Sequence, residues 1–443
     1  MNRKVTIITL GCPKNTVDSE NMSYLLESGG YEVVADYENP DIILINTCSF
    51  INDAKTQSIE TILEAEAFKK EHPEVKIVVS GCLSQRYVDE LMEEIPSVDA
   101  FVGTGRFYDI CDILDGLYQN EPTAKKYCDM IDRNIIECSR NLSTPYYYAY
   151  LKLAEGCDKH CTYCIIPSIR GKQRSRKIED IVEEAQQLAL EGVKEFILIA
   201  QDVGEYGTDI YQKRMLAPLL KELCKIDSLQ WIRLLYIYPE TITEDLIDTL
   251  KQEKKILHYI DIPFQHIDDT ILKAMGRHTS EQNIRDLIAR LRSELPDIII
   301  RSSFITGFPG ETQDQHNKLL AFLQEAHLQR VGIFPYSQEE GTAAAKLPDQ
   351  LTEEIKLQRY EELMAQQEHI SEKQMERFLE QTITVLIEAK EDTGVYTGRS
   401  YADAPEIDGV VYVYTDEPLT IGDFYSVLIN DTMEYDLIGK LVQ

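Results

Sequence analysis

The sequence has no apolar run close to the roughly 20 residues that a membrane-spanning helix needs. The apolar stretch 5–10, behind Arg3 and Lys4, is also shorter than the apolar core of a signal peptide, which takes about 7 to 15 residues. We therefore expect a cytoplasmic protein with no membrane partner. In the reducing cytosol, ten cysteines indicate metal or redox chemistry rather than a disulfide framework.

Positive charge is also scarce. The chain carries 45 Lys and Arg against 76 Asp and Glu, which gives a formal net charge of -31. A field of this sign repels the phosphate backbone of nucleic acids and attracts basic partners. The composition therefore predicts no specific nucleic-acid partner and favours a basic protein.

Long tracts of Pro, Gly or Ser are absent, and so are internal repeats of about 20 to 50 residues. At 443 residues, 43% of them hydrophobic, the chain is long enough for two or three ordered domains of about 150 residues each.

Residues 1–120 predict an α/β domain with a parallel sheet. Apolar runs alternate with helical patterns there, the runs at 5–10, 41–46, 75–80 and 100–103 and the helices at 15–27, 53–70 and 85–94. The mixed polar stretch 121–145, which holds Pro122 and Pro145, is predicted to be a linker.

Residues 146–378 predict a partial (β/α)6 barrel. Each of six strand patterns is followed by a helical pattern, the strands lying at 147–154, 195–200, 231–236, 258–263, 298–305 and 331–335. A long helix at about 352–378 ends this domain. Residues 379–443 then predict a small antiparallel β-barrel from short alternating runs at 384–389, 409–414, 424–429 and 435–442.

Three cysteines with the spacing CxxxCxxC follow the first strand of the predicted barrel: Cys157, Cys161 and Cys164. Three thiolates without an evident fourth ligand are what an iron-sulfur cluster with one open iron requires. A structural zinc site normally has four ligands, and His160 could be the fourth only if the loop folded back. The pattern favours the cluster.

Five residues at the carboxyl ends of other barrel strands are candidates for binding a cofactor: Gln201, Asp202, Gln265, His266 and Gly307. The working residues of such barrels lie at this edge. Taken singly, the glycine could equally be a turn residue, and Gln265 and His266 could be satisfied polar groups at a strand end.

Three more cysteines each follow a strand of the predicted N-terminal sheet directly: Cys12, Cys48 and Cys82. The carboxyl ends of parallel strands share one edge, so these thiols can converge there with helix N-termini nearby. This predicts a second three-thiolate site. The other four cysteines show no such pattern and are predicted to be small packing residues: Cys111, Cys128, Cys138 and Cys224.

A basic run follows the CxxxCxxC motif, with Arg170, Lys172, Arg174, Arg176 and Lys177. The run could indicate RNA binding, and the alternative is a solvated loop and helix start that contacts anionic groups of the substrate; bound RNA would be opposed by the charge of the rest of the surface.

The CxxxCxxC motif after the first strand of a β/α barrel resembles the radical S-adenosylmethionine superfamily. The resemblance implies that Cys157, Cys161 and Cys164 hold a [4Fe-4S] cluster whose open iron binds S-adenosylmethionine. One electron from that cluster then cleaves the cofactor to a 5′-deoxyadenosyl radical.

The order of the three domains resembles the methylthiotransferases over essentially the whole chain. The resemblance implies a second [4Fe-4S] cluster, on Cys12, Cys48 and Cys82, that carries the sulfur. It also implies two uses of S-adenosylmethionine: one molecule methylates that sulfur, and another yields the radical that removes hydrogen from the substrate. A reductant such as flavodoxin or ferredoxin is implied, and the C-terminal module resembles a TRAM domain that holds the macromolecular substrate.

Two subfamilies compete: one modifies an adenosine in tRNA, the other the β-carbon of an aspartate in small-subunit ribosomal protein number twelve. From residue 380 onward, 13 acidic residues stand against three basic ones, a net charge of -10 that would repel RNA. The strings CIIPSIRG (164–171), DIPFQH (261–266) and EEGT (339–342) resemble the protein-modifying type. We therefore expect the ribosomal protein, free or on the ribosome, as substrate. The alternatives are the tRNA enzyme and a non-catalytic iron-sulfur carrier, which has no need of six βα units.

Overall fold

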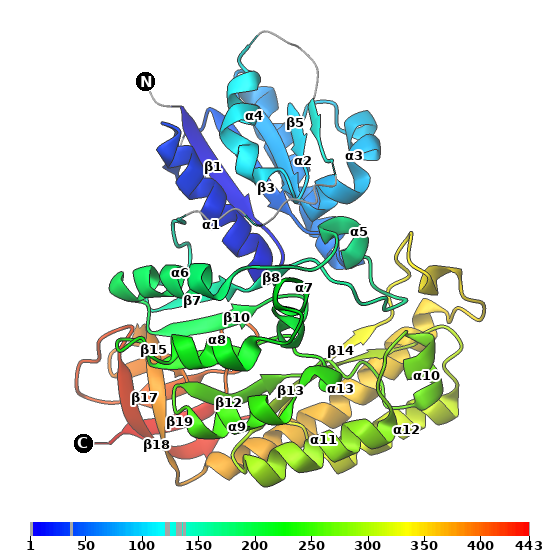
Figure 1. Ribbon diagram of the computed structural model, residues 1–443, viewed down its shortest axis with the longest axis vertical. Coiled ribbons are helices and arrows are strands. Elements are labelled where there is room, and N and C mark those ends of the chain that lie inside the picture. The colour runs from blue at the N-terminus through cyan, green and yellow to red at the C-terminus, as the bar shows by residue number, and fades with distance from the viewer. Residues whose placement is uncertain (1–2, 36–38, 120–124, 130–134, 136–138, 443) are drawn as a thin grey trace.

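The computed structural model describes residues 3–35, 39–119, 125–129, 135 and 139–442. Figure 1 shows the N-terminal sheet at the top of the molecule and the second parallel sheet below it, with the C-terminal strands, in orange and red, at the lower left beside that second sheet. No helix in these ranges is long and apolar enough to cross a membrane.

The N-terminal unit is a six-stranded parallel sheet in the order β2-β1-β3-β4-β5-β6. Its strands are β1 (Lys4–Thr9), β2 (Glu32–Val34), β3 (Ile42–Thr47), β4 (Lys76–Gly81), β5 (Ala100–Val102) and β6 (Lys125–Tyr127). Its helices are α1 (Pro13–Ser28), α2 (Asn52–Glu71), α3 (Cys82–Glu94) and α4 (Ile110–Gly116).

The two edge strands of this sheet, β2 and β6, are additions to the four strands predicted from the sequence. Each has three residues, too few to display a period of two. Strand β6 belongs to the stretch 121–145 that was predicted to be a linker, so part of that stretch is sheet. Other parts of it, including Pro122 and Cys138, lie outside the described residues.

The second unit confirms the predicted partial barrel. Its six parallel strands follow the order β14-β13-β12-β11-β10-β7, and among the described residues β7 and β14 are its two edges. The strands are β7 (Tyr148–Lys152), β10 (Glu195–Ile199), β11 (Trp231–Leu234), β12 (Ile256–Asp261), β13 (Ile299–Thr306) and β14 (Arg330–Pro335). The larger helices are α6 (Ile178–Leu190), α8 (Leu216–Leu223), α9 (Glu244–Gln252), α11 (Glu281–Glu294), α12 (Gln313–Ala326) and α13 (Glu353–Met375).

Shorter elements build the loops above this sheet. They are the helices α5 (Ile166–Arg170), α7 (Thr208–Tyr211) and α10 (Asp269–Ala274), and an antiparallel pair of strands, β8 (Ala154–Glu155) and β9 (Arg174–Ser175). The pair β8-β9 encloses the loop that carries the CxxxCxxC cysteines.

The C-terminal module is a closed barrel in the order β15-β16-β17-β19-β18. Its strands are β15 (Thr382–Asp392), β16 (Val395–Arg399), β17 (Val411–Tyr414), β18 (Phe424–Thr432) and β19 (Leu437–Leu441). The sequence predicted four antiparallel strands, whereas β16 is a fifth. Four of the pairings are antiparallel, and β17 pairs with β19 in parallel.

The two faces of the six-stranded sheet pack against different partners. Alternate residues such as Leu151, Leu198 and Ile260 share a core with the helices. Residues between them, including Tyr148 and Tyr259, share a core with the C-terminal barrel. The C-terminal module therefore covers part of the face that the helices leave open.

A buried charge network joins the sheet to this module. Glu195 is fully buried and accepts hydrogen bonds from Arg233 Nε at 2.8 Å and Arg399 Nη2 at 2.7 Å. Burial opposes its charge, yet Arg399 and Arg233 together hold the pKa of Glu195 below its usual value. Arg233 also donates to the carbonyl of Tyr401 at 2.8 Å, so it contacts the C-terminal module directly.

We expect Glu195→Gln to destabilise the protein by about 3–5 kcal/mol, because it removes the negative member of a buried ion pair without changing its volume. Chemical denaturation of the wild type and the variant measures the difference. Glu294→Gln, at an exposed pair with Lys251, is the matched control and should leave the unfolding midpoint unchanged. Equal midpoints for all three proteins would contradict this account.

Candidate metal centres and cofactor pocket

The loops after β1, β3 and β4 bring Cys12, Cys48 and Cys82 to the carboxyl edge of the N-terminal sheet. Cys12 is the N-cap of α1 and Cys82 the first residue of α3. Gly11 has φ +96°, and a Cβ built there would lie 2.6 Å from the Cβ of Cys48 and 3.0 Å from its Sγ. Only glycine fits so close an approach, which packs the loop of Cys12 onto that of Cys48.

Burial sets the protonation of these thiols. It raises the pKa of Cys82 to about 12, against an opposing effect of Arg170, and it also raises the pKa of Cys48. The Cys12 thiol contributes to both shifts in the same direction as burial. Metal binding at this edge must therefore displace protons, as is usual for thiolate sites.

The second set of thiols lies in the loop between β8 and α5. Burial raises the pKa of Cys157 to about 11 and that of Cys164 to about 12. The amide of Cys164 donates to the carbonyl of Cys161 at 3.0 Å, and the amide of Lys159 donates to Cys157 Sγ at 3.4 Å. The three side chains act on one another electrostatically, since Cys161 and Cys157 both contribute to the shift of Cys164.

Two groups from the barrel, the half-buried Tyr238 and the buried Arg277, contact the middle thiol of this set. The Tyr238 hydroxyl is 3.5 Å from Cys161 Sγ, and Arg277 Nη1 is 3.9 Å from the same atom. The Arg277 guanidinium also lies 3.9 Å from the centre of the Tyr238 ring. A cation and a hydroxyl are thus available to stabilise a thiolate at Cys161.

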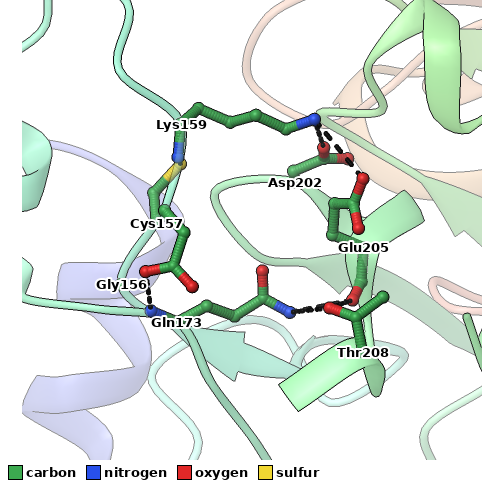
Figure 2. Close-up of a pocket in the computed structure, with 8 residues that line it drawn as sticks. Gly156, Cys157, Lys159, Gln173, Asp202, Glu205 and Thr208 are labelled. Carbon is green, nitrogen blue, oxygen red and sulfur yellow. Dashed lines mark hydrogen bonds and ion pairs between the residues drawn. The ribbon is translucent and has the colours of Figure 1, made fainter. Parts of the chain in front are cut away.

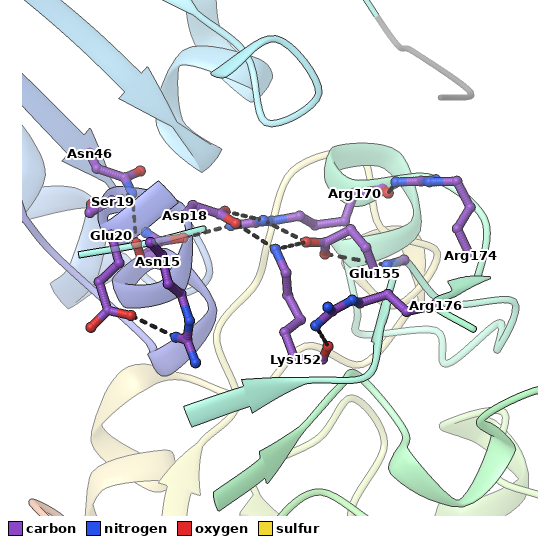
Figure 3. A network of polar contacts seen from close by, with 12 residues as sticks. Asn15, Asp18, Ser19, Glu20, Asn46, Lys152, Glu155, Arg170, Arg174 and Arg176 are labelled. Atoms are coloured by element: carbon purple, nitrogen blue, oxygen red, sulfur yellow. Dashed lines mark hydrogen bonds and ion pairs between the residues drawn. The ribbon is translucent and has the colours of Figure 1, made fainter. Parts of the chain in front are cut away.

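A buried network of charges crosses the interface between the N-terminal sheet and the barrel (Figure 3). Arg170, 4% exposed, donates to Asp18 at 2.6 Å and to Asn15 at 2.6 Å on α1, and to Glu155 at 3.1 Å in the barrel. Lys152 pairs with the same two carboxylates, at 2.6 Å to Asp18 and 3.3 Å to Glu155. Burial disfavours the charged Glu155, but Arg170 and Lys152 hold its pKa well below the usual range.

Arg170 links this network to the first set of thiols, because its Nη2 also donates to Cys82 Sγ at 3.5 Å. Glu155 links it to the second set, because it is followed directly by Gly156 and Cys157. A short chain of charged side chains therefore connects the two groups of cysteines.

A pocket of about 200 Å³ opens beside Cys157 (Figure 2). Its lining is formed by Gly156, Cys157, Asp158, Lys159, Gln173, Asp202, Glu205 and Thr208. Lys159 forms ion pairs with Asp202 and Glu205, and the Gln173 amide donates to the carbonyl of Glu205 at 2.8 Å. Three carboxylates line this pocket, Asp202 and Glu205 across from Cys157 and Asp158 in the loop of Cys157, and such a lining suits a cationic ligand that carries hydroxyl groups.

Of the five residues predicted to bind a cofactor, Gln201 and Asp202 lie nearest the thiols. Gln201 donates to Glu155 at 2.9 Å, and its Oε1 is buried without a hydrogen-bond partner among the described residues. Asp202 lines the pocket, and burial raises its pKa to about 6 against the effect of Lys159.

The other three predicted residues do not line this pocket. His266 is fully buried, its Nδ1 accepts from the amide of Asp268, and its Nε2 has no partner in the described chain. Burial lowers the pKa of His266 to about 3, so the ring is neutral. Gly307, at φ +73°, donates to Glu311 in a turn.

The side chains of the basic run differ in burial. Arg170 and Arg176 are buried, and Arg176 pairs with Glu184 at 2.5 Å. Lys172 and Lys177 are exposed. The prediction of a solvated loop is therefore wrong for Arg170 and Arg176, because both form buried ion pairs inside the protein.

The number of thiols in each set fits an iron-sulfur cluster better than zinc. Three thiolates are the ligand count of a four-iron cluster with one open iron, whereas a structural zinc site normally has four ligands. In the described ranges, no three or more His, Cys, Asp or Glu side chains form a group that could hold a single metal ion.

Sequence reasoning missed the polar partners of these thiols. Asn15, Asp18 and Glu20 look like an exposed face of α1, yet all three are buried. The run of polar residues directly after Cys12 was the available signal. Tyr238 and Arg277 follow no local pattern.

The barrel with its three loop thiols belongs to a known class. Residues 151–323 match the radical SAM superfamily, residues 4–103 the uncharacterized protein family UPF0004, and residues 381–442 the TRAM domain. A solved structure of the radical S-adenosylmethionine methyltransferase TsrM from Kitasatospora setae matches with a TM-score of 0.56 at 16% identity, over 76% of this chain and 75% of that one. At that identity the match supports the fold, and the family match makes this protein a radical S-adenosylmethionine enzyme.

Curated relatives narrow the class. The ribosomal protein uS12 methylthiotransferase RimO of Thermoanaerobacter sp. (strain X514) is 49% identical over 99% of this chain and 100% of its own. The enzymes of the same name from Lachnoclostridium phytofermentans and Clostridioides difficile (strain 630) are 48% and 46% identical, over 98% and 99% of this chain and 99% of each of theirs. The chain belongs to the uS12 methylthiotransferase family. It is a methylthiotransferase rather than a passive iron-sulfur carrier, and its cofactors are S-adenosylmethionine and two [4Fe-4S] clusters.

We expect Arg170→Met to loosen the interface between the N-terminal sheet and the barrel. The variant leaves Asp18 and Glu155 buried with Lys152 as their remaining cation, at a cost of about 3–5 kcal/mol. Hydrogen exchange followed by mass spectrometry should speed up in α1 and in the loop 156–165. Lys172→Met, at an exposed position two residues further on, should exchange like the wild type. Unchanged protection of α1 in Arg170→Met would refute the structural role of this network.

Proposed function

We propose that this protein transfers a methylthio group to the β-carbon of an aspartate in the small-subunit ribosomal protein uS12. The observation that carries the proposal is the presence of two three-thiol sets on opposite sides of one interface, joined by a buried charge network, in a chain of this family.

We assign Cys157, Cys161 and Cys164 to the cluster that binds S-adenosylmethionine, and the auxiliary cluster to the other set of thiols, Cys12, Cys48 and Cys82. Thiolates are the usual ligands of such clusters, which supports this assignment. When bound, these cofactors supply a radical that removes hydrogen from an unactivated carbon, a step beyond the reach of acid–base side chains.

The protein positions these groups and keeps water out. Asp202 and the other carboxylates of the pocket beside Cys157 are suited to the cationic cofactor, and Gln201 positions Glu155 below it. We propose Gln265, His266 and Gly307, at neighbouring strand ends, as further cofactor-binding residues outside the lining of this pocket. The unpartnered Nε2 of His266 supports such a role.

The charge of the C-terminal module supports a basic protein as substrate. Eight of its acidic side chains are exposed: Glu380, Glu391, Asp392, Glu406, Asp416, Glu417, Asp431 and Glu434. Such a surface attracts a basic ribosomal protein, free or on the ribosome, and repels RNA. We infer that the enzyme acts in the cytoplasm with a flavodoxin or ferredoxin as reductant. Methylthiolation of tRNA is not favoured.

The test is the mass of uS12 after incubation with the reconstituted enzyme, S-adenosylmethionine and a reductant. We expect one methylthio group on an aspartate of uS12 and none on tRNA treated in parallel. The Cys157/Cys161/Cys164 triple Ala variant should leave uS12 unmodified. A methylthio group on tRNA, with uS12 unchanged, would reverse the choice of substrate.

The cluster assignment predicts the iron content. After anaerobic reconstitution the wild type should hold about eight irons per chain, as two four-iron clusters require, and the Cys12/Cys48/Cys82 triple Ala variant about four. A triple Ala variant of the packing cysteines Cys111, Cys128 and Cys224 should keep all eight. About four irons in the wild type would leave the N-terminal thiols without a cluster.

A further inference from the structure

The Lys14 side chain is mostly buried, and its ammonium group has no acceptor among the described residues. It stands two residues after Cys12 in the first turn of α1 and is 8% exposed. In the described part of the chain, no group lies within hydrogen-bond or ion-pair distance of its Nζ, and its side-chain contact is the Tyr236 ring, 4.5 Å away. An ammonium group that no acceptor of the protein neutralises is available to an anionic ligand.

The neighbouring cations differ from Lys14 in this respect. Lys152, 3% exposed at the same interface, holds both Asp18 and Glu155. Arg170 holds the same two carboxylates. The acceptors of the interface are therefore occupied, and Lys14 remains as the cation available to an incoming anion.

Tyr236 is the barrel residue that contacts Lys14. It follows β11 at the mouth of the barrel, and its backbone is held at φ +59° by a hydrogen bond from its amide to Asp261 at 3.1 Å and one from Val203 to its carbonyl at 3.0 Å. A left-handed backbone is strained for tyrosine, and such residues cluster at functional sites. Its hydroxyl has no hydrogen-bond partner within the described ranges.

We propose that Lys14, stacked on Tyr236, binds the side-chain carboxylate of the substrate aspartate. The site lies between the two sets of thiols, since Lys14 stands two residues after Cys12, and Tyr236 stands two residues before Tyr238, whose hydroxyl is 3.5 Å from Cys161 Sγ. The N-terminus of the 16-residue helix α1 adds a further preference for an anion. This inference rests on the proposed function.

Such a site fixes the reacting carbon. In aspartate the β-carbon is bonded directly to the side-chain carboxylate, so holding that carboxylate leaves the β-carbon little freedom to move. Asparagine has the same shape but lacks the charge that Lys14 would pair with. Lys14 therefore selects aspartate over asparagine and positions it, without itself taking part in bond breaking.

The experiment compares Lys14→Met and Lys14→Arg with the wild type, using uS12 and a uS12 variant with Asn at the modified aspartate. Lys14→Met should keep about eight irons and an unchanged electron paramagnetic resonance spectrum, and should still cleave S-adenosylmethionine to 5′-deoxyadenosine. Its affinity for uS12 should fall about 10- to 100-fold, as loss of a charged hydrogen bond predicts, and it should bind the Asp and Asn forms equally. Lys14→Arg should recover part of the preference for Asp.

The outcomes separate this inference from the proposed function. Lys172→Met, on the exposed part of the basic run, is the control and should behave as the wild type does. Loss of iron or an altered spectrum in Lys14→Met, with equal wild-type affinity for the Asp and Asn forms, would make Lys14 a counter-charge for the metal centre and overturn the carboxylate site. If Lys14→Met discriminates as well as the wild type, only the carboxylate site falls. If the wild type fails to modify uS12, the proposed function falls and the carboxylate site with it.

Discussion

The buried charges that pair across the interface between the N-terminal domain and the barrel fix how these two parts of the protein are oriented. Arg170 and Lys152 come from the barrel, Asp18 and Asn15 from α1, and Glu155 lies next to Cys157. A buried ion pair adds little net stability, but a displaced one leaves charge uncompensated. The network therefore acts mainly on geometry: it penalises any other orientation of the two thiol-bearing units more than it stabilises this one.

The other two domains cover the partial barrel at two places, its mouth and its open face. Each contact is made through buried ion pairs. At its mouth, α1 contributes acceptors to Arg170 and Lys152. On its open face, the C-terminal module contributes Arg399, which meets Glu195 inside. Both contacts join charged residues far apart in the sequence and bury them. The acidic side chains left on the surface of the module are then free to face a basic partner.

Features that depend on a local sequence pattern could be predicted from the sequence. Features that depend on contacts between residues distant in the sequence could not. Buried strands such as β3 and β10 are continuous apolar runs, and a thiol that ends a parallel strand has only one edge to occupy. Strands β2 and β6 are too short to show a period, and the parallel pairing of β17 with β19 has no local cause. Asp18 looks solvent-exposed until Arg170, 152 positions along the chain, is placed against it.

The C-terminal module follows the barrel in the sequence, which affects how the chain folds during its synthesis. Synthesis proceeds from the N-terminus, so the six thiols that we assign to clusters and the six strands of the barrel sheet are made before β15. The aromatic side chains that later contact the module, Tyr148, Tyr150 and Tyr259 among them, stay uncovered during that interval. Because β19 pairs with both β17 and β18, the module closes only after β19 has been made. A nascent chain interrupted shortly before β19 therefore exposes this aromatic surface on a sheet whose own strands are complete, which makes the interval before β19 the step most vulnerable to aggregation.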